Sequence, residues 1–318
     1  MFKTVSVIGG DLRQLTVANE LAYDGYDVTV YGFNDKTTPN IIPAIVDIDT
    51  ALDSEIIILP VPVSFDGMYI NTPYSDIKLS VRELIDKLNP SCLVFGGCIS
   101  DSFSDDLSKK GIKHLDYMLR DELAIKNAVP TAEGAIEIAI SETPITLHNS
   151  KCLVLGYGKV GKILSKSLDA LGAKTYVSAR KYADLALIEG HGCYPLSINE
   201  AKSRLGEFDI IFNTGPALIL GDAELSKIHR DTLIIDLASK PGGVDMDAAK
   251  DLGVKVIWAL GIPGKTAPVT AGNIIKEITQ IAGGRGGGKP DMAQGGGKDA
   301  SKIDEALAAV SELVKGQI

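Results

Sequence analysis

The sequence predicts an α/β protein with two Rossmann-like domains, each a doubly wound parallel sheet. Two observations lead to this fold class. A strand, a glycine turn, a helix and a second strand follow one another in residues 4–32, and the same order of elements returns in residues 151–180. After each unit, short apolar runs alternate with polar or helical segments, which suits the crossovers of a parallel sheet. We therefore expect two similar domains that face one another across a cleft.

The individual strands are predicted from short runs rich in Val, Ile, Leu and Phe. In the first half, a helix at 12–23 is expected between strands at 4–8 and 27–32. The other buried strands are predicted at 55–59, 92–95, 112–115, 209–213, 233–237 and 254–258.

The connection between the two halves is predicted to be helical. Residues 129–134 (VPTAEG) place a proline before an apolar pattern that continues through Ile136 and Ile140, so a linking helix is expected to start near Pro130. We therefore divide the chain into an N-terminal substrate and catalytic domain (1–129), a cofactor domain (130–264) that begins with the linking helix (130–142), a closing helix (265–282) that packs back towards the first domain, and a Gly-rich C-terminal tail (283–318).

The composition is that of a soluble globular protein, with 318 residues, a formal net charge of −9 and 45% hydrophobic residues. No apolar run reaches the length of a membrane span, and the N-terminus lacks the pattern of a secretory signal, so we expect a cytoplasmic protein. The acidic balance disfavours nucleic acids and membranes as partners and favours small molecules. Cys92, Cys98, Cys152 and Cys193 form no C-x-x-C pair, and we interpret them as reduced core thiols.

One glycine loop has the pattern of a dinucleotide site. Residues 153–161 (LVLGYGKVG) place G-x-G-x-x-G directly after an apolar strand and at the start of a helix. The first glycine permits the tight turn, the second lets a pyrophosphate approach the backbone, and the third allows the helix to pack closely on the strand. Amides at the helix N-terminus would then hold the pyrophosphate. The cofactor-binding residues predicted here are Gly156, Tyr157, Gly158, Lys159, Val160 and Gly161.

The end of the next strand favours NADP over NAD. An acidic residue about 20 positions after the glycines would bind the ribose 2′-hydroxyl of NAD, but this chain has Ser178, Arg180 and Lys181. These side chains supply a hydroxyl group and two cations for a 2′-phosphate. The alternative interpretation is a solvated basic turn. Asn213 and Thr214 follow a strand of the same domain, and we expect them either to line the cofactor cleft or to form a plain turn.

The first glycine loop is different, because Asp11 stands where a pyrophosphate would lie and would oppose it. One interpretation makes Asp11 the N-cap of the following helix. The other makes it a polar contact to a substrate, with Arg13 and Gln14 as donors to a substrate carboxylate.

Five segments, in order, resemble the family of the dipicolinate synthase A-subunit over about residues 1–276: VIGGDLRQ, RDELAIKNAVPTAEG, LGYGKVG, IIDLASKPGGVD and LGIPGKTAPVTAG. The resemblance implies oxidation of a dihydrodipicolinate-level intermediate of the lysine pathway to dipicolinate, with the hydride passed to NADP, in the mother cell of a sporulating bacterium. It also implies that the partner is the flavoprotein-like B-subunit of dipicolinate synthase, and a homo-oligomer is expected. More distantly, the layout resembles alanine dehydrogenase and the 2-hydroxyacid dehydrogenases.

The resemblance also implies a substrate cleft. Arg13, Arg120 and Lys240 suit the two carboxylates of the substrate, although relatives are expected to carry arginine at position 240. Glu133 and Asp11 are the candidate bases for the proton that aromatisation releases. No histidine has a recognisable catalytic pairing, and no cluster of metal ligands is visible. The residues mapped to this cleft are Gly10, Asp11, Arg13, Gln14, Arg120, Asp121, Thr131, Glu133, Ser239 and Lys240.

The tail departs from this family. The stretch IKEITQIAGGRGGGKPDMAQGGGKDASKIDEAL resembles the extreme C-terminus of alanyl-tRNA synthetase, where it closes a much larger domain that is missing here. Basic and acidic residues balance from residue 283 on, which gives little attraction for RNA. We interpret the tail as a flexible or loosely docked appendage, with transfer-RNA binding as the alternative.

Two rival hypotheses for the whole chain stay open. One is a stand-alone amino-acid or 2-hydroxyacid dehydrogenase, against which the lack of a histidine paired with a carboxylate counts. The other is a non-catalytic subunit that senses NADP and serves assembly.

Overall fold

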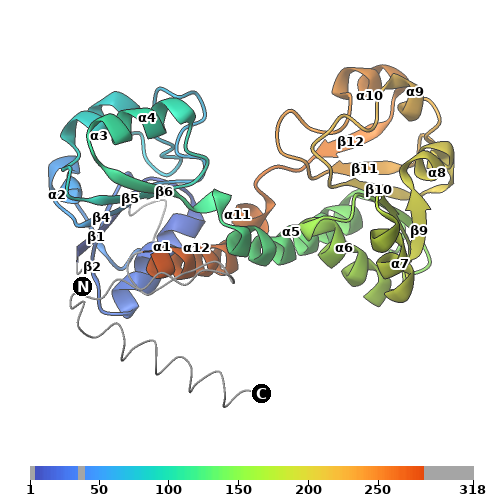
Figure 1. The fold of residues 1–318 in the computed structure, drawn as a ribbon, viewed down its shortest axis with the longest axis horizontal. Coiled ribbons are helices and arrows are strands. Elements are labelled where there is room, and N and C mark those ends of the chain that lie inside the picture. The colour runs from blue at the N-terminus through green and yellow to red at the C-terminus, as the bar shows by residue number, and fades with distance from the viewer. Residues whose placement is uncertain (1–3, 35–39, 283–318) are drawn as a thin grey trace, which may run out of the picture.

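Two six-stranded parallel sheets organise the protein, whose computed structural model describes residues 4–34 and 40–282 (Figure 1). The first sheet has the order β3-β2-β1-β4-β5-β6, and the second, read from its other edge, has the equivalent order β9-β8-β7-β10-β11-β12. Both are doubly wound Rossmann sheets. The strands are β1 (Thr4–Ile8), β2 (Asp27–Tyr31), β3 (Ala44–Ile45), β4 (Ile56–Ile58), β5 (Leu93–Gly96), β6 (Lys113–Asp116), β7 (Lys151–Leu155), β8 (Lys174–Ala179), β9 (Tyr194–Ser197), β10 (Ile210–Asn213), β11 (Leu233–Asp236) and β12 (Lys255–Trp258).

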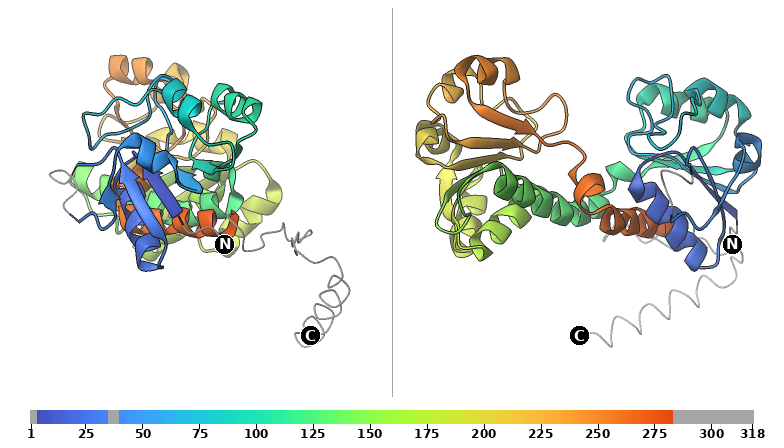
Figure 2. Two further views of the ribbon diagram at one scale, coloured as in Figure 1. Left: turned by 90° about the vertical axis from the view of Figure 1, so that its left-hand side faces the viewer. Right: turned by 180° about the vertical axis from the view of Figure 1, so that it is seen from behind.

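Helices cover both faces of each sheet (Figures 1 and 2). The α-helices are α1 (Leu12–Tyr23), α2 (Ile48–Leu52), α3 (Val81–Lys87), α4 (Asp101–Lys109), α5 (Asp121–Glu142), α6 (Lys159–Ala170), α7 (Tyr182–Gly190), α8 (Ile198–Ser203), α9 (Asp222–Leu225), α10 (Met246–Leu252), α11 (Ile262–Thr266) and α12 (Pro268–Ala282). Two 3₁₀ turns lie at Tyr117–Leu119 and Leu205–Glu207.

Alternation along the buried strands separates the core into one layer on each face of a sheet. In β4, Ile56 and Ile58 pack on the side of α1 and α12, whereas Ile57 packs on the side of α3 and α4. Successive side chains of a strand point to opposite faces, so a strand that is apolar throughout requires helices on both. The predictions of α1 and of every strand named in the sequence analysis are confirmed, with ends that shift by one or two residues.

Two edge strands were not predicted. β3 has two exposed residues, Ala44 and Ile45, which leaves no apolar run to detect. β9 contains Pro195, which argues against a central strand but is tolerated at the edge where β9 lies.

The linking helix was predicted with the wrong start. α5 begins at Asp121 and passes through Pro130 without ending, so the division that we placed at 129/130 falls within one helix. A proline disfavours helical geometry in the residue before it and lacks an N–H, and for that reason the sequence indicated a boundary. Here Pro130 is buried, and Thr131 one residue later donates its hydroxyl to the carbonyl of Asn127. Packing of α5 against α6, α11 and α12 outweighs the local preference.

The closing helix returns to the first domain, as predicted. α12 lies alongside α1 in all views, and its Ile275 and Ile278 belong to the core of the first sheet (Figure 2). Lys276 forms an ion pair of 2.8 Å with Asp24 at the end of α1. The tail at 283–318, for which we made a separate prediction, lies outside the described residues. Within the described ranges, no helix has the length and apolar character needed to cross a membrane.

Candidate functional site

The glycine loop after β7 leaves little space for side chains. Gly156 has φ +105°, a left-handed conformation that favours glycine. A Cβ atom at Gly161 would lie 2.2 Å from the carbonyl oxygen of Gly156, so the third glycine is what allows α6 to start against the turn. Gly158 is the N-cap of α6 and provides no side-chain hydrogen bond, which leaves the first amides of this helix to a ligand. The loop therefore has the geometry of an anion site.

Two of the predicted cofactor residues, Ser178 and Thr214, contact this loop from the side of the sheet. The hydroxyl of Ser178, which is fully buried, accepts a hydrogen bond of 3.3 Å from the amide of Gly156. Thr214 donates its hydroxyl to the carbonyl of Leu155, 3.0 Å away, and packs directly on Gly156. Asn213 is also fully buried. Ser178 and Asn213 thus face the protein interior, whereas the neighbouring Arg180 and Lys181 are exposed.

Arg180 and Lys181 lie at the carboxyl end of β8, where α7 begins. Both side chains are exposed, and neither forms an ion pair with any described residue. β8 lies beside β7, so these cations and the glycine loop share one edge of the sheet. An anion bound between them would meet two charges that no carboxylate of the described chain neutralises.

The other loop side chains have diverse surroundings. Tyr157 is nearly buried in the core, where its hydroxyl group lies 2.9 Å from Nδ1 of His191, and burial raises the pKa of this tyrosine. Val160 is half-buried. Lys159 forms an ion pair of 2.7 Å with Asp121 at the start of α5, and this contact lowers the pKa of the Asp121 carboxyl group.

In the first domain, the Asp11 loop is an internally bonded unit. Asp11 is the N-cap of α1, as one of our two interpretations expected, and its carboxylate accepts bonds of 2.7 to 3.1 Å from the guanidinium of Arg13. The same guanidinium donates to the carbonyl of Val61. Gln14 completes the capping box and is fully buried beside the hydroxyl of Tyr117. Gln14 is therefore part of the loop's framework and does not present its amide to solvent.

The Asp11 loop, at the carboxyl edge of the first sheet, lies against α11, the helix that follows β12 of the second sheet. A Cβ atom at Gly264 of α11 would lie 2.6 Å from Nε of Arg13, so the backbone of α11 touches the Asp11–Arg13 pair. The Lys159–Asp121 pair makes a second link between the halves. We call these five residues (Asp11, Arg13, Asp121, Lys159 and Gly264) the junction. Because ligands of doubly wound sheets bind outside the carboxyl ends of the strands, the junction is the expected place for a substrate next to the cofactor loop.

The remaining predicted substrate residues do not bond to the Asp11–Arg13 pair within the described chain. Arg120 precedes α5 and pairs with Glu122 at 2.8 Å. Glu133 is exposed on α5. Ser239 and Lys240 are exposed in the loop that follows β11, at the carboxyl edge of the second sheet.

Sequence reasoning missed two features of the site. Cys98 is exposed, which corrects the interpretation of all four cysteines as core thiols; the other three are buried. Cys98 follows β5 with φ 56°, and partial loss of hydration around its thiol, together with the neighbouring Asp116, raises the pKa of that thiol. The second feature is Asp236, a buried carboxylate at the end of β11. Its position after an apolar strand and before Pro-Gly-Gly was a signal that could have been used.

The histidines have local partners or packing contacts. His114 bonds Ser104 at 2.7 Å, His148 packs on Gly172, and His229 lies 3.5 Å from Asp231. Among the described residues, no group of three or more His, Cys, Asp and Glu is arranged to hold a metal ion.

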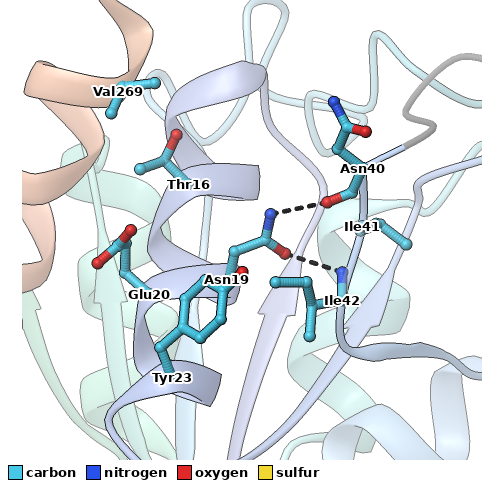
Figure 3. A pocket seen from close by; sticks show the side chains of 8 residues that line it. All are labelled: Thr16, Asn19, Glu20, Tyr23, Asn40, Ile41, Ile42 and Val269. Atoms are coloured by element: carbon cyan, nitrogen blue, oxygen red, sulfur yellow. Dashed lines mark hydrogen bonds between the residues drawn. The ribbon is translucent and has the colours of Figure 1, made fainter.

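A surface hollow of about 480 Å³ lies elsewhere on the first domain, along α1 (Figure 3). Asn19 joins its two sides, because its amide group donates to the carbonyl of Asn40 and accepts from the amide of Ile42. The hollow contains no predicted site residue. Its lining is Thr16, Asn19, Glu20, Tyr23, Asn40, Ile41, Ile42 and Val269.

Comparison with known proteins identifies the family. The family of the N-terminal domain of the dipicolinate synthase A-subunit matches residues 4–118. The dipicolinate synthase A-subunit of Bacillus subtilis (strain 168) is 35% identical over 278 residues, which cover 86% of this chain and 93% of that protein. The chain belongs to the family of the dipicolinate synthase A-subunit. Family membership and the dehydrogenase-like fold together support an oxidoreductase.

Solved structures agree with this assignment. The dipicolinate synthase A-subunit from Bacillus halodurans superimposes with a TM-score of 0.81 at 33% identity, over 88% of this chain and 97% of that one. The corresponding Bacillus subtilis structure gives 0.79 at 33% identity, over 89% and 97%. An L-alanine dehydrogenase shares the fold at a TM-score of 0.60 and 16% identity, over 87% and 90%.

The C-terminal part also resembles a second family. The DHHA1 domain matches residues 239–316, a range that begins within the second Rossmann sheet domain. An alanine–tRNA ligase of Streptococcus pyogenes serotype M1 is 64% identical over 53 residues, which cover 17% of this chain but only 6% of the ligase. This match confirms the resemblance of the tail to alanyl-tRNA synthetase.

Proposed function

We propose that this chain is the NADP-dependent oxidoreductase component of dipicolinate synthase, which oxidises a dihydrodipicolinate-level intermediate of the lysine pathway to dipicolinate during sporulation. The observation that carries the proposal is the pairing of a tight glycine turn at Gly156 with two exposed cations, Arg180 and Lys181, which follow the adjacent strand and form no ion pair with a described residue. Uncapped amides at the start of α6 suit a pyrophosphate, and the cations suit a 2′-phosphate. When bound, NADP would accept the hydride that the substrate loses.

Binding of the substrate is proposed for the junction. Arg13 is held by Asp11 and Val61 through Nε and Nη2, and Nη1 makes no hydrogen bond with a described residue. An oriented guanidinium loses little freedom when it binds a carboxylate, so Arg13 is a suitable anchor. Lys240, exposed at the carboxyl edge of the other sheet, is proposed to bind the second carboxylate, and Arg120 to add positive potential.

Aromatisation of a dihydropyridine ring also releases a proton. Asp11 is engaged by Arg13, whereas Glu133 is exposed on α5 without a hydrogen bond to a described residue. We therefore propose that the carboxylate of Glu133 is the base that accepts this proton. Three further elements are carried into the proposal from the family: the flavoprotein-like B-subunit, which would be the partner, the homo-oligomeric state and the mother-cell cytoplasm.

The cofactor assignment is tested with Arg180→Ala. We expect the Kd for NADP to rise about tenfold or more, since a charged hydrogen bond is lost, while the Kd for NAD changes little. Arg230→Ala is the matched control, because Arg230 is also exposed but precedes β11 at the opposite edge of the sheet. Equal losses for NADP and NAD in Arg180→Ala would contradict the assignment.

The reaction is tested with the purified chain, with and without the B-subunit, by following the absorbance of NADPH and of dipicolinate. Product from the chain alone would exclude a purely sensing role. Activity with amino acids or 2-hydroxy acids, but not with the dihydrodipicolinate-level substrate, would favour a stand-alone dehydrogenase.

A further inference from the structure

We infer that Asp236 and Asn213 are positioning residues, which fix the loop that carries Ser239 and Lys240 relative to the glycine loop. The inference rests on the proposed function, because that function gives Lys240 its role at the substrate. Neither Asp236 nor Asn213 would touch the substrate itself, since no more than 1% of the surface of either residue is exposed.

The two residues end neighbouring strands and face one another directly. Asn213 is the last residue of β10 and Asp236 the last of β11, and they are register partners in the sheet. The amide nitrogen of Asn213 donates to Oδ1 of Asp236 over 2.7 Å. The pair thus lies beneath the two loops that leave this edge of the sheet.

Asp236 organises the loop at 237–243. Its Oδ1 accepts from the amide of Ala238 at 3.1 Å, and its Oδ2 accepts from the amide of Gly243 at 2.8 Å. The first and last parts of the loop are therefore bonded to the same carboxylate. The carbonyl of Ala238 in turn accepts from the indole of Trp258 at 2.9 Å. Ser239, Lys240 and Pro241 lie exposed between these fixed points, and Ser239 and Lys240 are the two of them whose side chains can bond a polar ligand.

Asn213 organises the turn on the cofactor side. Its side chain donates to the carbonyl of Gly215 at 3.0 Å and accepts from the amide of Gly215 at 3.2 Å. The intervening residue, Thr214, contacts the glycine loop through Leu155 and Gly156. The two loops also join each other, because the carbonyl of Gly243 accepts from the amides of Ile219 and Leu220.

A carboxylate buried at this depth is costly to keep unless every acceptor is used. Asp236 meets that condition with three donors, and a Cβ atom at Gly243 would lie 2.1 Å from the amide nitrogen of Asn213, so the loop closes tightly over the pair. An uncharged acceptor of the same shape cannot receive all three bonds. The carboxylate thereby holds the cofactor turn and the substrate loop at one fixed separation.

The test compares Asp236→Asn with Asp245→Asn. Asp245 is the N-cap of α10 and supplies a carboxylate bond in the same domain but outside the two loops. Amide hydrogen exchange over residues 237–244 is measured by mass spectrometry. In Asp236→Asn we expect the exchange rate there to rise about tenfold or more, which corresponds to the loss of about one hydrogen bond. In Asp245→Asn the exchange rate over the same residues should stay near the wild-type value. In Asp236→Asn we also expect a substrate KM about tenfold higher, with the Kd for NADP changed less than about threefold.

Asn213→Ser is the alternative test if Asp236→Asn does not fold, because it keeps the Asp236 carboxylate and removes the side-chain amide of residue 213 that donates to it. It should speed exchange at Gly215 and weaken NADP binding together. Wild-type exchange over 237–244 in Asp236→Asn, or faster exchange with unchanged KM and kcat, would overturn the inference. If the wild-type chain together with its B-subunit oxidises no dihydrodipicolinate-level substrate, the proposed function fails, whereas the exchange rates still decide whether the pair holds the loop.

Discussion

Replacing Gly161 by alanine should damage cofactor binding more than it damages the fold. The new Cβ would lie 2.2 Å from the carbonyl oxygen of Gly156, whereas carbon and oxygen atoms in ordinary contact are about 3.3 Å apart. Either α6 or the glycine turn must therefore move by roughly 1 Å. A movement of this size displaces the amides that face the pyrophosphate. The loss of one charge-assisted hydrogen bond, about 1.5–3 kcal/mol, corresponds to a Kd for NADP that is roughly 10 to 150 times higher.

The effect on stability should be smaller, because two contributions oppose each other. Overpacking costs about 1–3 kcal/mol, while alanine within a helix gains about 1 kcal/mol over glycine. The net change is then about 0–2 kcal/mol, measurable by thermal unfolding.

Gly190→Ala is the matched control for this experiment, since Gly190 ends α7 in the same domain and a Cβ there meets nothing within 4 Å. Calorimetric titration with NADP gives the Kd of each variant. A Gly161→Ala protein that binds NADP with the wild-type Kd would refute the argument, because the contact between Gly161 and Gly156 would then be irrelevant to the site.

Three further changes test the packing and the thiols. Gly134→Ala places a Cβ 2.2 Å from Ile262 at the contact of α5 with α11, so overpacking opposes the helix preference of alanine and urea unfolding should show a net loss of about 0–2 kcal/mol; a gain of about 1 kcal/mol, the helix preference alone, would contradict that contact. The hydrogen bond from Lys276 lowers the pKa of Asp24, so this partly exposed pair should contribute up to about 1 kcal/mol above pH 3.9, the ordinary pKa of an aspartate, and lose it as the pH falls through the lowered pKa. Asp24→Asn should then be less stable than wild type near neutral pH and equal to it in acid, and a difference that persists in acid would count against the pair. Native protein should react with a thiol reagent at Cys98 alone, increasingly at alkaline pH because its thiol pKa is raised, and Cys98→Ser should abolish the reaction.

Much of the fold could be predicted because the central strands of each half of the chain are short apolar runs that stand out in the sequence. The glycine pattern at 156–161 also indicated which edge of the second sheet carries the candidate site, since the loop must follow β7 and precede α6. Helix α5 could not be predicted with its correct start, because the local signal at Pro130 opposes the helix and only packing against α6, α11 and α12 overrides it.

The residue types of the candidate site can be read from the sequence, but the hydrogen bonds among those residues cannot. The sequence shows an acidic, a basic and an amide side chain at Asp11, Arg13 and Gln14. It does not reveal that Asp11 forms an ion pair with Arg13 or that Gln14 is buried. The same limit applies to Asp236, whose role depends on Asn213, a residue of the adjacent strand. The Asp236–Asn213 pair arises from the register of the sheet, which one sequence does not specify.

Titration calorimetry of the wild-type chain with NADP and with NAD tests the central claim most directly. The account predicts binding of both nucleotides at one site, with NADP about tenfold or more tighter because Arg180 and Lys181 meet its additional phosphate. A well-folded sample that gave no binding heat with either nucleotide, or that bound NAD more tightly than NADP, would contradict it.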